Sequence, residues 1–176
     1  TRLAARVARG EVPNPSDDVA AHRYELIDNK LHTLGMTWYE VSNWAKPGGE
    51  CRHNIAYWRN QDWLGIGPGA HAHSAGTRSW NLKHPAAWAA KVDDGVSAIA
   101  DSEILEAKDV KHEDIMLGLR LREGLALTAL GEAGLAQAEL AVSEGLLVPQ
   151  EFANGKAVLT FQGRLLADGL VARLWA

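Results

Sequence analysis

The segment CRHNIAYW at residues 51–58 places a histidine, an asparagine and two aromatic side chains in one short stretch. If this stretch is helical, His53 and Tyr57 share a face, because side chains four residues apart in a helix are neighbours. A neutral imidazole is a good ligand for haem iron, and adjacent aromatic rings suit a flat macrocycle. The residues therefore offer His53 as an iron ligand, with Asn54 to orient it or to cap a helix. The alternative, a structural histidine in an aromatic-rich loop, is the commoner role of a single histidine.

A second candidate is the glycine-rich run WLGIGPGAH at residues 63–71. Gly65, Gly67 and Ala70 fit the G-x-G-x-x-G/A spacing, whose glycines let a backbone approach the phosphates of a dinucleotide. However, Pro68 and the polar residues that follow do not suit the crossover helix of a dinucleotide-binding βαβ unit. A nucleotide-like or nucleoside-like ligand and a tight turn at the end of a buried strand both remain open.

The other reactive side chains predict no dedicated site. The spacing of the histidines matches no zinc signature such as H-E-x-x-H; the set is His53, His71, His73 and His84. Cys51 has no second cysteine to resolve it, so a redox role has weak support. The acidic pairs at 17–18 and 93–94 lie at expected helix ends, where capping explains them.

The composition excludes several classes of protein. The 176 residues include 18 basic and 22 acidic side chains, a net charge of −4, which offers no electrostatic footprint for nucleic acid. The single cysteine excludes an internal disulfide and suits a reducing cytoplasm. No stretch reaches the roughly 18 apolar residues of a membrane span. Because the chain starts at Thr1 without a signal-peptide pattern, we expect a piece of a longer cytoplasmic protein.

A helix and a strand precede the candidate residues. Apolar side chains recur at steps of four and three over residues 17–34, with Ser16 as a cap and Gly35 at the end. Residues 36–41 (MTWYEV) are rich in strand formers. A helix followed closely by a strand is half of a βα repeat, which predicts parallel neighbouring strands upstream.

The candidate residues themselves lie in a region, residues 42–79, whose polar and glycine-rich sequence shows little periodicity. Such a region is usually either functional or a stretch whose elements have been assigned wrongly. A short helix with proline at its first position is expected over residues 85–92. Five of the seven tryptophans fall between Trp44 and Trp88. They predict either a core built on large apolar side chains or an aromatic wall for a planar ligand.

From about residue 101 the sequence becomes more acidic, with 7 basic and 12 acidic side chains. It predicts three helices, a β-hairpin and a last helix, the pattern of a winged-helix-like module. The predicted helices cover 110–122, a short turn at 128–131, 135–143 and, last, 161–174, and the hairpin joins strands 146–150 and 157–160 through Asn154-Gly155. We therefore expect two domains, an α/β unit at 1–100 and an α+β unit at 101–176.

Three strings in this order resemble one protein family: YEVSNWA at 39–45, CRHNIAYW at 51–58 and GIGPGAH at 65–71. The chain resembles the C-terminal half of radical S-adenosylmethionine proteins related to oxygen-independent coproporphyrinogen III oxidase. Within that family it is most similar to haem chaperones of the HemW type. The resemblance covers nearly the whole chain. It implies the last part of a partial (β/α) barrel followed by the winged-helix-like domain.

The resemblance also implies roles for particular residues. The haem-binding motif of the chaperones falls on His53, Asn54, Tyr57 and Trp58, with His53 as the iron ligand. The implied partners are haem and haem-acceptor proteins. The glycine-rich stretch that lies near the S-adenosylmethionine pocket falls on Gly65, Gly67 and Ala70.

The family's C-x-x-x-C-x-x-C motif, which holds a [4Fe–4S] cluster, is absent from this chain. One cysteine cannot supply the three thiolates required, so the cluster and S-adenosylmethionine are expected only with an upstream half. The alternatives are a fragment of a coproporphyrinogen III oxidase and a winged-helix DNA-binding module. The acidic C-terminal half counts against the second.

Overall fold

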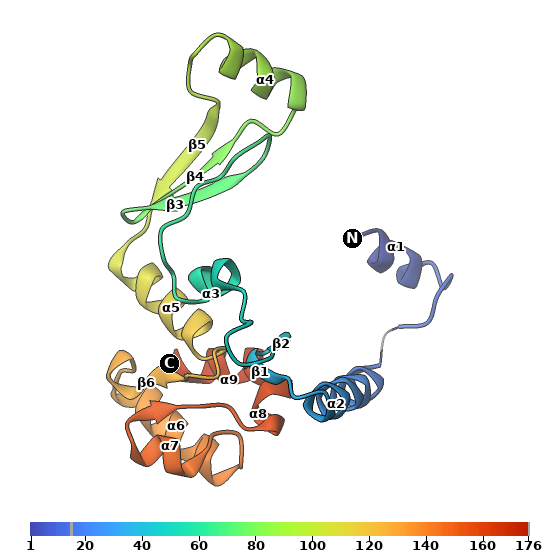
Figure 1. The fold of residues 1–176 in the computed structure, drawn as a ribbon, viewed down its shortest axis with the longest axis vertical. Coiled ribbons are helices and arrows are strands. Elements are labelled where there is room, and N and C mark those ends of the chain that lie inside the picture. The colour runs from blue at the N-terminus through green and yellow to red at the C-terminus, as the bar shows by residue number, and fades with distance from the viewer. Residues whose placement is uncertain (15, 176) are drawn as a thin grey trace.

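The structure is a computed structural model that describes residues 1–14 and 16–175. Figure 1 shows a group of helices towards the C-terminus, an arm of strands that extends away from it, and two helices at the N-terminal end. The predicted mixture of helix and sheet is confirmed. The sheets within the described residues are antiparallel, and the parallel strands expected upstream stay a prediction.

The N-terminal helices are α1 (Arg2–Ala8) and α2 (Asp17–Thr33). The second confirms the helix predicted from residue 17. The Ser16 hydroxyl accepts a hydrogen bond from the Val19 amide at 3.4 Å, which caps the first turn. Gly35 follows the last turn with φ of +74°, a conformation that favours glycine.

The strand predicted over residues 36–41 is β1 (Thr37–Glu40). It pairs antiparallel with β2 (Asn43–Ala45) after a tight turn. One further bridge joins Glu40 to Leu121 of the C-terminal part. The predicted strand is therefore confirmed, whereas its observed partners are a hairpin neighbour and a distant segment.

The region of residues 42–79, whose sequence shows little periodicity, contains a helix and most of a sheet. In addition to β2, it forms α3 (Arg52–Trp58), β3 (His71–Ser74) and most of β4 (Thr77–Asn81). These elements span only four to seven residues each. Such lengths are too short for a periodic pattern of apolar residues to develop.

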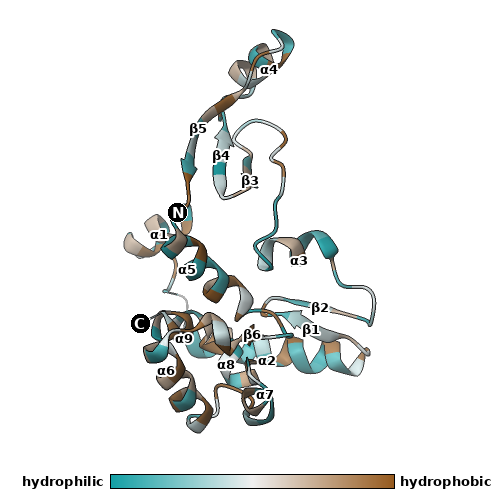
Figure 2. Cartoon of the chain, turned by 90° about the vertical axis from the view of Figure 1, so that its left-hand side faces the viewer, coloured by the Kyte–Doolittle hydropathy of each residue, from teal (hydrophilic) through white to brown (hydrophobic). Residues whose placement is uncertain are grey.

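The arm is a three-stranded antiparallel sheet in which β4 lies between β3 and β5 (Ile99–Ile104). The connection between β4 and β5 contains α4 (Pro85–Asp93), which confirms the helix predicted at 85–92. Figure 2 shows hydrophobic residues at the ends of β5, where Ile99 and Ile104 are exposed. The domain boundary predicted after residue 100 falls inside β5, so this strand crosses the proposed division.

The C-terminal part holds nearly all of the core. Its elements are α5 (Ala107–Gly118), β6 (Leu125–Ala126), η1 (Leu127–Ala129), α6 (Glu132–Ser143), α7 (Pro149–Ala153), β7 (Lys156–Ala157), α8 (Phe161–Leu165) and α9 (Ala167–Leu174). Among the described residues, every buried apolar side chain except Ala45 lies between Ile115 and Leu174. This part therefore carries most of the hydrophobic stabilisation.

The predicted hairpin of strands 146–150 and 157–160 is confirmed only in part, because Leu147 and Leu159 form an isolated antiparallel bridge but a helix stands where the tight turn was expected. Pro149 instead begins α7, since its fixed φ suits the first helical position. Asn154 and Gly155 close that helix, with Gly155 at φ of +84°. An Asn-Gly pair serves a helix end as well as a hairpin turn. In the C-terminal part, a two-stranded sheet pairs β6 with β7.

Two predicted helices differ at their ends. The helix expected over 161–174 is divided at Leu166, whose φ of −114° and ψ of 17° separate α8 from α9. The helix expected over 110–122 is α5, which ends at Gly118. The prediction at 135–143 is confirmed within α6. The winged-helix arrangement itself stays a prediction.

Candidate functional site

The short helix α3 carries all four residues of the predicted haem motif and turns them towards different surroundings. His53 and Tyr57 share one face, as expected, with ring centroids 4.8 Å apart and planes at 74°. Both side chains are exposed. The imidazole is therefore accessible to a large ligand, with an aromatic edge beside it.

The aromatic row continues beyond the helix. The Tyr57 ring meets the Trp63 ring edge-on, with centroids 5.0 Å apart. The Trp63 backbone exchanges two hydrogen bonds with His73 of β3, at 2.8 and 3.0 Å. The exposed face of α3 is thus joined to the start of the glycine-rich run and to the arm.

Asn54 and Trp58 make internal contacts instead. The Asn54 amide donates a hydrogen bond to the Tyr39 hydroxyl of β1, at 3.2 Å. The Arg120 guanidinium lies over the Trp58 ring, 5.9 Å from its centroid. The Trp58 indole N–H is buried and has no hydrogen-bond partner among the described residues. These two motif residues fasten α3 to its surroundings rather than extend its exposed aromatic face.

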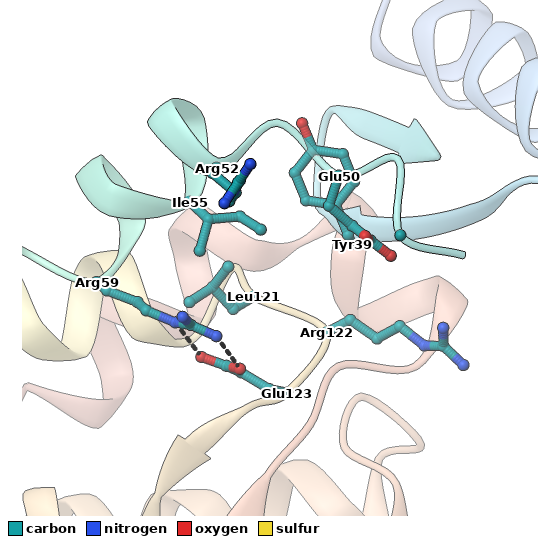
Figure 3. Close-up of a pocket in the computed structure, with 9 residues that line it drawn as sticks. Tyr39, Glu50, Arg52, Ile55, Arg59, Leu121, Arg122 and Glu123 are labelled. Carbon is teal, nitrogen blue, oxygen red and sulfur yellow. Dashed lines mark hydrogen bonds and ion pairs between the residues drawn. The ribbon is translucent and has the colours of Figure 1, made fainter. Parts of the chain in front are cut away.

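A cavity of about 720 Å³ lies along a third face of α3 (Figure 3). The helix contributes Arg52 and Ile55, and its cap residue is Arg59. The three fall on one side because they are three and four residues apart. The other lining residues come from β1, from the loop before α3 and from the segment after α5: Tyr39, Gly48, Glu50, Leu121, Arg122 and Glu123. Three arginines and two glutamates give this lining a net positive charge.

One of these arginines is already paired. Arg59 donates two hydrogen bonds to the Glu123 carboxylate, at 2.8 and 2.7 Å, drawn as dashed lines in Figure 3. These hydrogen bonds lower the pKa of the Glu123 carboxyl group below its usual value, against an opposing effect of burial. Both partners therefore stay charged at neutral pH and close one wall of the cavity.

The glycine-rich run folds back onto the arm. A Cβ atom at Gly65 would overlap the His71 carbonyl oxygen, so no other residue fits this backbone position. Gly67 has a φ of +106°. The Asn81 side chain donates to the Gly65 and Gly67 carbonyls, at 3.3 and 2.9 Å. Close packing explains Gly65, and the positive φ explains Gly67, where a Cβ atom would meet nothing within 4 Å. The Ala70 carbonyl accepts a hydrogen bond from the Asn81 backbone amide.

No group of three or more histidine, cysteine, aspartate or glutamate side chains is placed to hold a metal ion in the described residues. Cys51 is exposed and precedes α3 as its cap residue. One thiolate does not fit a [4Fe–4S] cluster, which requires several. No helix in the described part of the chain is long and apolar enough to cross a membrane.

Sequence reasoning missed the ion pair that joins α2 to the C-terminal part. Arg164 is buried, and its guanidinium donates to both Asp28 carboxylate oxygens, at 2.9 and 3.0 Å. The Trp44 indole N–H also donates to Asp28, at 2.6 Å. The Trp38 ring lies 4.7 Å from the guanidinium carbon. Trp44 of the YEVSNWA string was the available signal, but Arg164 lies 136 residues away from Asp28 in the sequence.

Sequence reasoning also missed the cavity. Tyr39 and Arg52 lie inside the YEVSNWA and CRHNIAYW strings, but only the structure brings them together with Arg122. A helix with one exposed histidine face and one arginine face could have been suspected from residues 52–59 alone. The residues after α5 gave no comparable signal.

Comparisons with known proteins place the chain in a family. No family model matches it. It is 49% identical to the haem chaperone HemW of Mycobacterium tuberculosis, over 99% of this chain and 44% of the relative. It is 30% identical to HemW of Bacillus subtilis, over 91% of this chain. It is 31% identical to a mitochondrial radical S-adenosyl methionine domain-containing protein of Danio rerio, over 71% of this chain.

A solved structure agrees at the level of the fold. Coproporphyrinogen III oxidase (HemN) from Escherichia coli, described as a radical SAM enzyme, matches with a TM-score of 0.65 at 18% identity. The match covers 91% of this chain and 42% of that one. The chain also spans less than half the length of the mycobacterial relative. On the sequence matches, this chain belongs to the radical S-adenosylmethionine protein family that includes the HemW haem chaperones.

Proposed function

We propose that this chain is the haem-binding part of a haem chaperone of the HemW type, which passes haem to acceptor proteins. The observation that carries the proposal is the exposed pair of His53 and Tyr57 on α3. In this proposal His53 binds the iron and Tyr57 contacts the edge of the macrocycle. Asn54 and Trp58 hold the helix in place, through Tyr39 and Arg120.

The side chains present fit haem as cargo. An accessible imidazole supplies the nitrogen that haem iron takes as an axial ligand. The same chain does not fit the iron–sulfur cluster, because it has one cysteine. We therefore assign the cluster, and the rest of the S-adenosylmethionine site, to sequence outside this chain. A contact of Gly65, Gly67 or Ala70 with S-adenosylmethionine is part of the proposal. The single cysteine also favours a cytoplasmic location.

A coproporphyrinogen III oxidase is the second candidate, favoured by the fold it shares with HemN. The two functions make different demands on His53. A chaperone must hold iron-containing haem, whereas the oxidase acts on a porphyrinogen that contains no iron. An accessible imidazole beside an aromatic ring therefore favours the chaperone.

The test is a haem titration followed by absorbance in the Soret region, on the unmodified chain and on two variants. His53→Ala removes the proposed ligand. His84→Ala is the matched control, since His84 is also exposed but caps α4 in the arm without a side-chain hydrogen bond. We expect saturation near one equivalent for the unmodified chain and the control, and a weakened, spectrally shifted complex for His53→Ala. Identical titrations for all three proteins would reject His53 as the ligand.

A further inference from the structure

We propose that the cavity beside α3 binds the propionate carboxylates of haem, through the Arg52 and Arg122 guanidinium groups and the Tyr39 hydroxyl. This inference rests on the proposed function, because it requires a macrocycle bound near His53. It adds a binding site for the carboxylates to the ligand for the iron. The cavity volume of about 720 Å³ lies within the range of small-molecule sites.

Two of the three arginines that line the cavity are available to bind an anion. Arg59 is committed to Glu123 by two hydrogen bonds. Within the part of the chain that the structure describes, Arg52 and Arg122 donate no side-chain hydrogen bond and form no ion pair. Figure 3 shows both guanidinium groups without a partner among the lining residues. A guanidinium group recognises a carboxylate through two parallel hydrogen bonds, so each can take one propionate.

The Tyr39 hydroxyl group, which also lines the cavity, has a proton that it can donate. The Tyr39 hydroxyl oxygen accepts its hydrogen bond from the Asn54 amide, at 3.2 Å. Its own proton therefore remains available to an acceptor in the cavity. This contact gives Asn54, the second residue of the motif, a positioning role. It fixes the donor that faces the carboxylate, without touching the iron.

The cavity lies next to the proposed iron ligand, His53, along the same helix. Arg52 and His53 are consecutive residues, so their Cα atoms are about 3.8 Å apart. Their side chains point about 100° apart around the helix axis, one lining the cavity and the other exposed. A macrocycle on His53 can thus direct its propionate edge towards the cavity. The Glu50 carboxylate also lines the cavity and repels an anion beside it, so the proposal assigns the propionates to Arg52 and Arg122.

The test compares haem with its dimethyl ester, in which both carboxylates are blocked, in the same detergent solution. The variants are Arg52→Gln, Arg122→Gln and Tyr39→Phe. The matched control is Arg23→Gln, which changes an exposed arginine on α2. We expect each arginine variant to weaken haem binding by about five- to tenfold, and Tyr39→Phe by about threefold. The Soret maximum should not move, because the iron ligand is unchanged.

The ester separates carboxylate recognition from loss of folding. Its affinity for the unmodified chain should already be reduced, and the arginine variants should reduce it no further. Arginine variants that bind haem like the unmodified chain, or that weaken haem and ester equally, would overturn the inference. If His53→Ala still alters the spectrum in that case, the proposed function stands alone. If the unmodified chain binds no haem, both proposals fall.

Discussion

Arg164 of α8 and Asp28 of α2 form a bidentate ion pair that connects these two helices. The arginine side chain is 5% exposed and the aspartate side chain 22%. The Trp38 and Phe161 rings lie 4.7 and 5.1 Å from the guanidinium carbon. This pair holds α2 and β1, the strand that contains Tyr39, against the apolar core.

The first prediction concerns the stability that depends on this pair. Arg164→Met should lower the free energy of unfolding by about 2–4 kcal/mol, because it leaves the Asp28 carboxylate without its main partner. Denaturant unfolding measures the loss. The control is Asp168→Asn, whose carboxylate is 90% exposed opposite Arg120 and should cost less than about 1 kcal/mol. Equal losses for the two variants would contradict this account.

The second prediction concerns pH. The hydrogen bonds from Arg164 lower the pKa of Asp28 below its ordinary 3.8, against the opposing effect of burial. A carboxyl group with a lowered pKa contributes stability above its unfolded pKa and loses it as the pH falls through the folded pKa. The unmodified chain should therefore be more stable than Asp28→Asn at pH 7, and this difference should shrink below about pH 4. A difference that is constant from pH 7 to pH 3 would refute the assignment.

The third prediction concerns the glycine-rich run. Gly65→Ala should destabilise the chain by about 1–3 kcal/mol, because its Cβ would overlap the His71 carbonyl oxygen. Gly169→Ala in α9 is the control. A Cβ atom at that position would have open space around it, so alanine should be neutral or stabilising there. Thermal unfolding distinguishes the two. An unchanged midpoint for Gly65→Ala would mean that local packing does not explain this glycine.

Local sequence signals predicted some elements well and others poorly. Ser16 and Gly35 marked the ends of α2, because capping chemistry is read from neighbouring residues. The Asn154-Gly155 pair misled, because the same dipeptide ends a helix and turns a hairpin. The choice depended on Pro149, which starts α7.

The residues of the site were likewise predicted where the signal is local and missed where it depends on packing between distant segments. Placing His53 and Tyr57 on one face required only helical spacing, which the structure confirms. The contact between Asn54 and Tyr39, and the cavity that reaches Arg122, depend on how α3 packs on β1 and on the segment after α5. No local pattern encodes such packing. Segments that meet only in the fold leave no periodic trace in the sequence.

The fourth prediction concerns the distribution of stability. Amide hydrogen exchange should be faster in residues 1–80 than in residues 101–176, because the buried apolar side chains concentrate in the second range. Leu64 and Ile66 are 81% and 86% exposed, so the segment before the arm has little burial to protect it. Equal protection in the two ranges would contradict this expectation.

The central claim is that His53 binds the iron of haem. The most direct measurement compares the affinities of iron protoporphyrin IX and metal-free protoporphyrin IX for the unmodified chain and for His53→Ala. An imidazole ligand stabilises only the iron complex. We predict that the unmodified chain prefers the iron porphyrin and that His53→Ala abolishes this preference while retaining the weaker porphyrin affinity. The same preference in both proteins would contradict the claim.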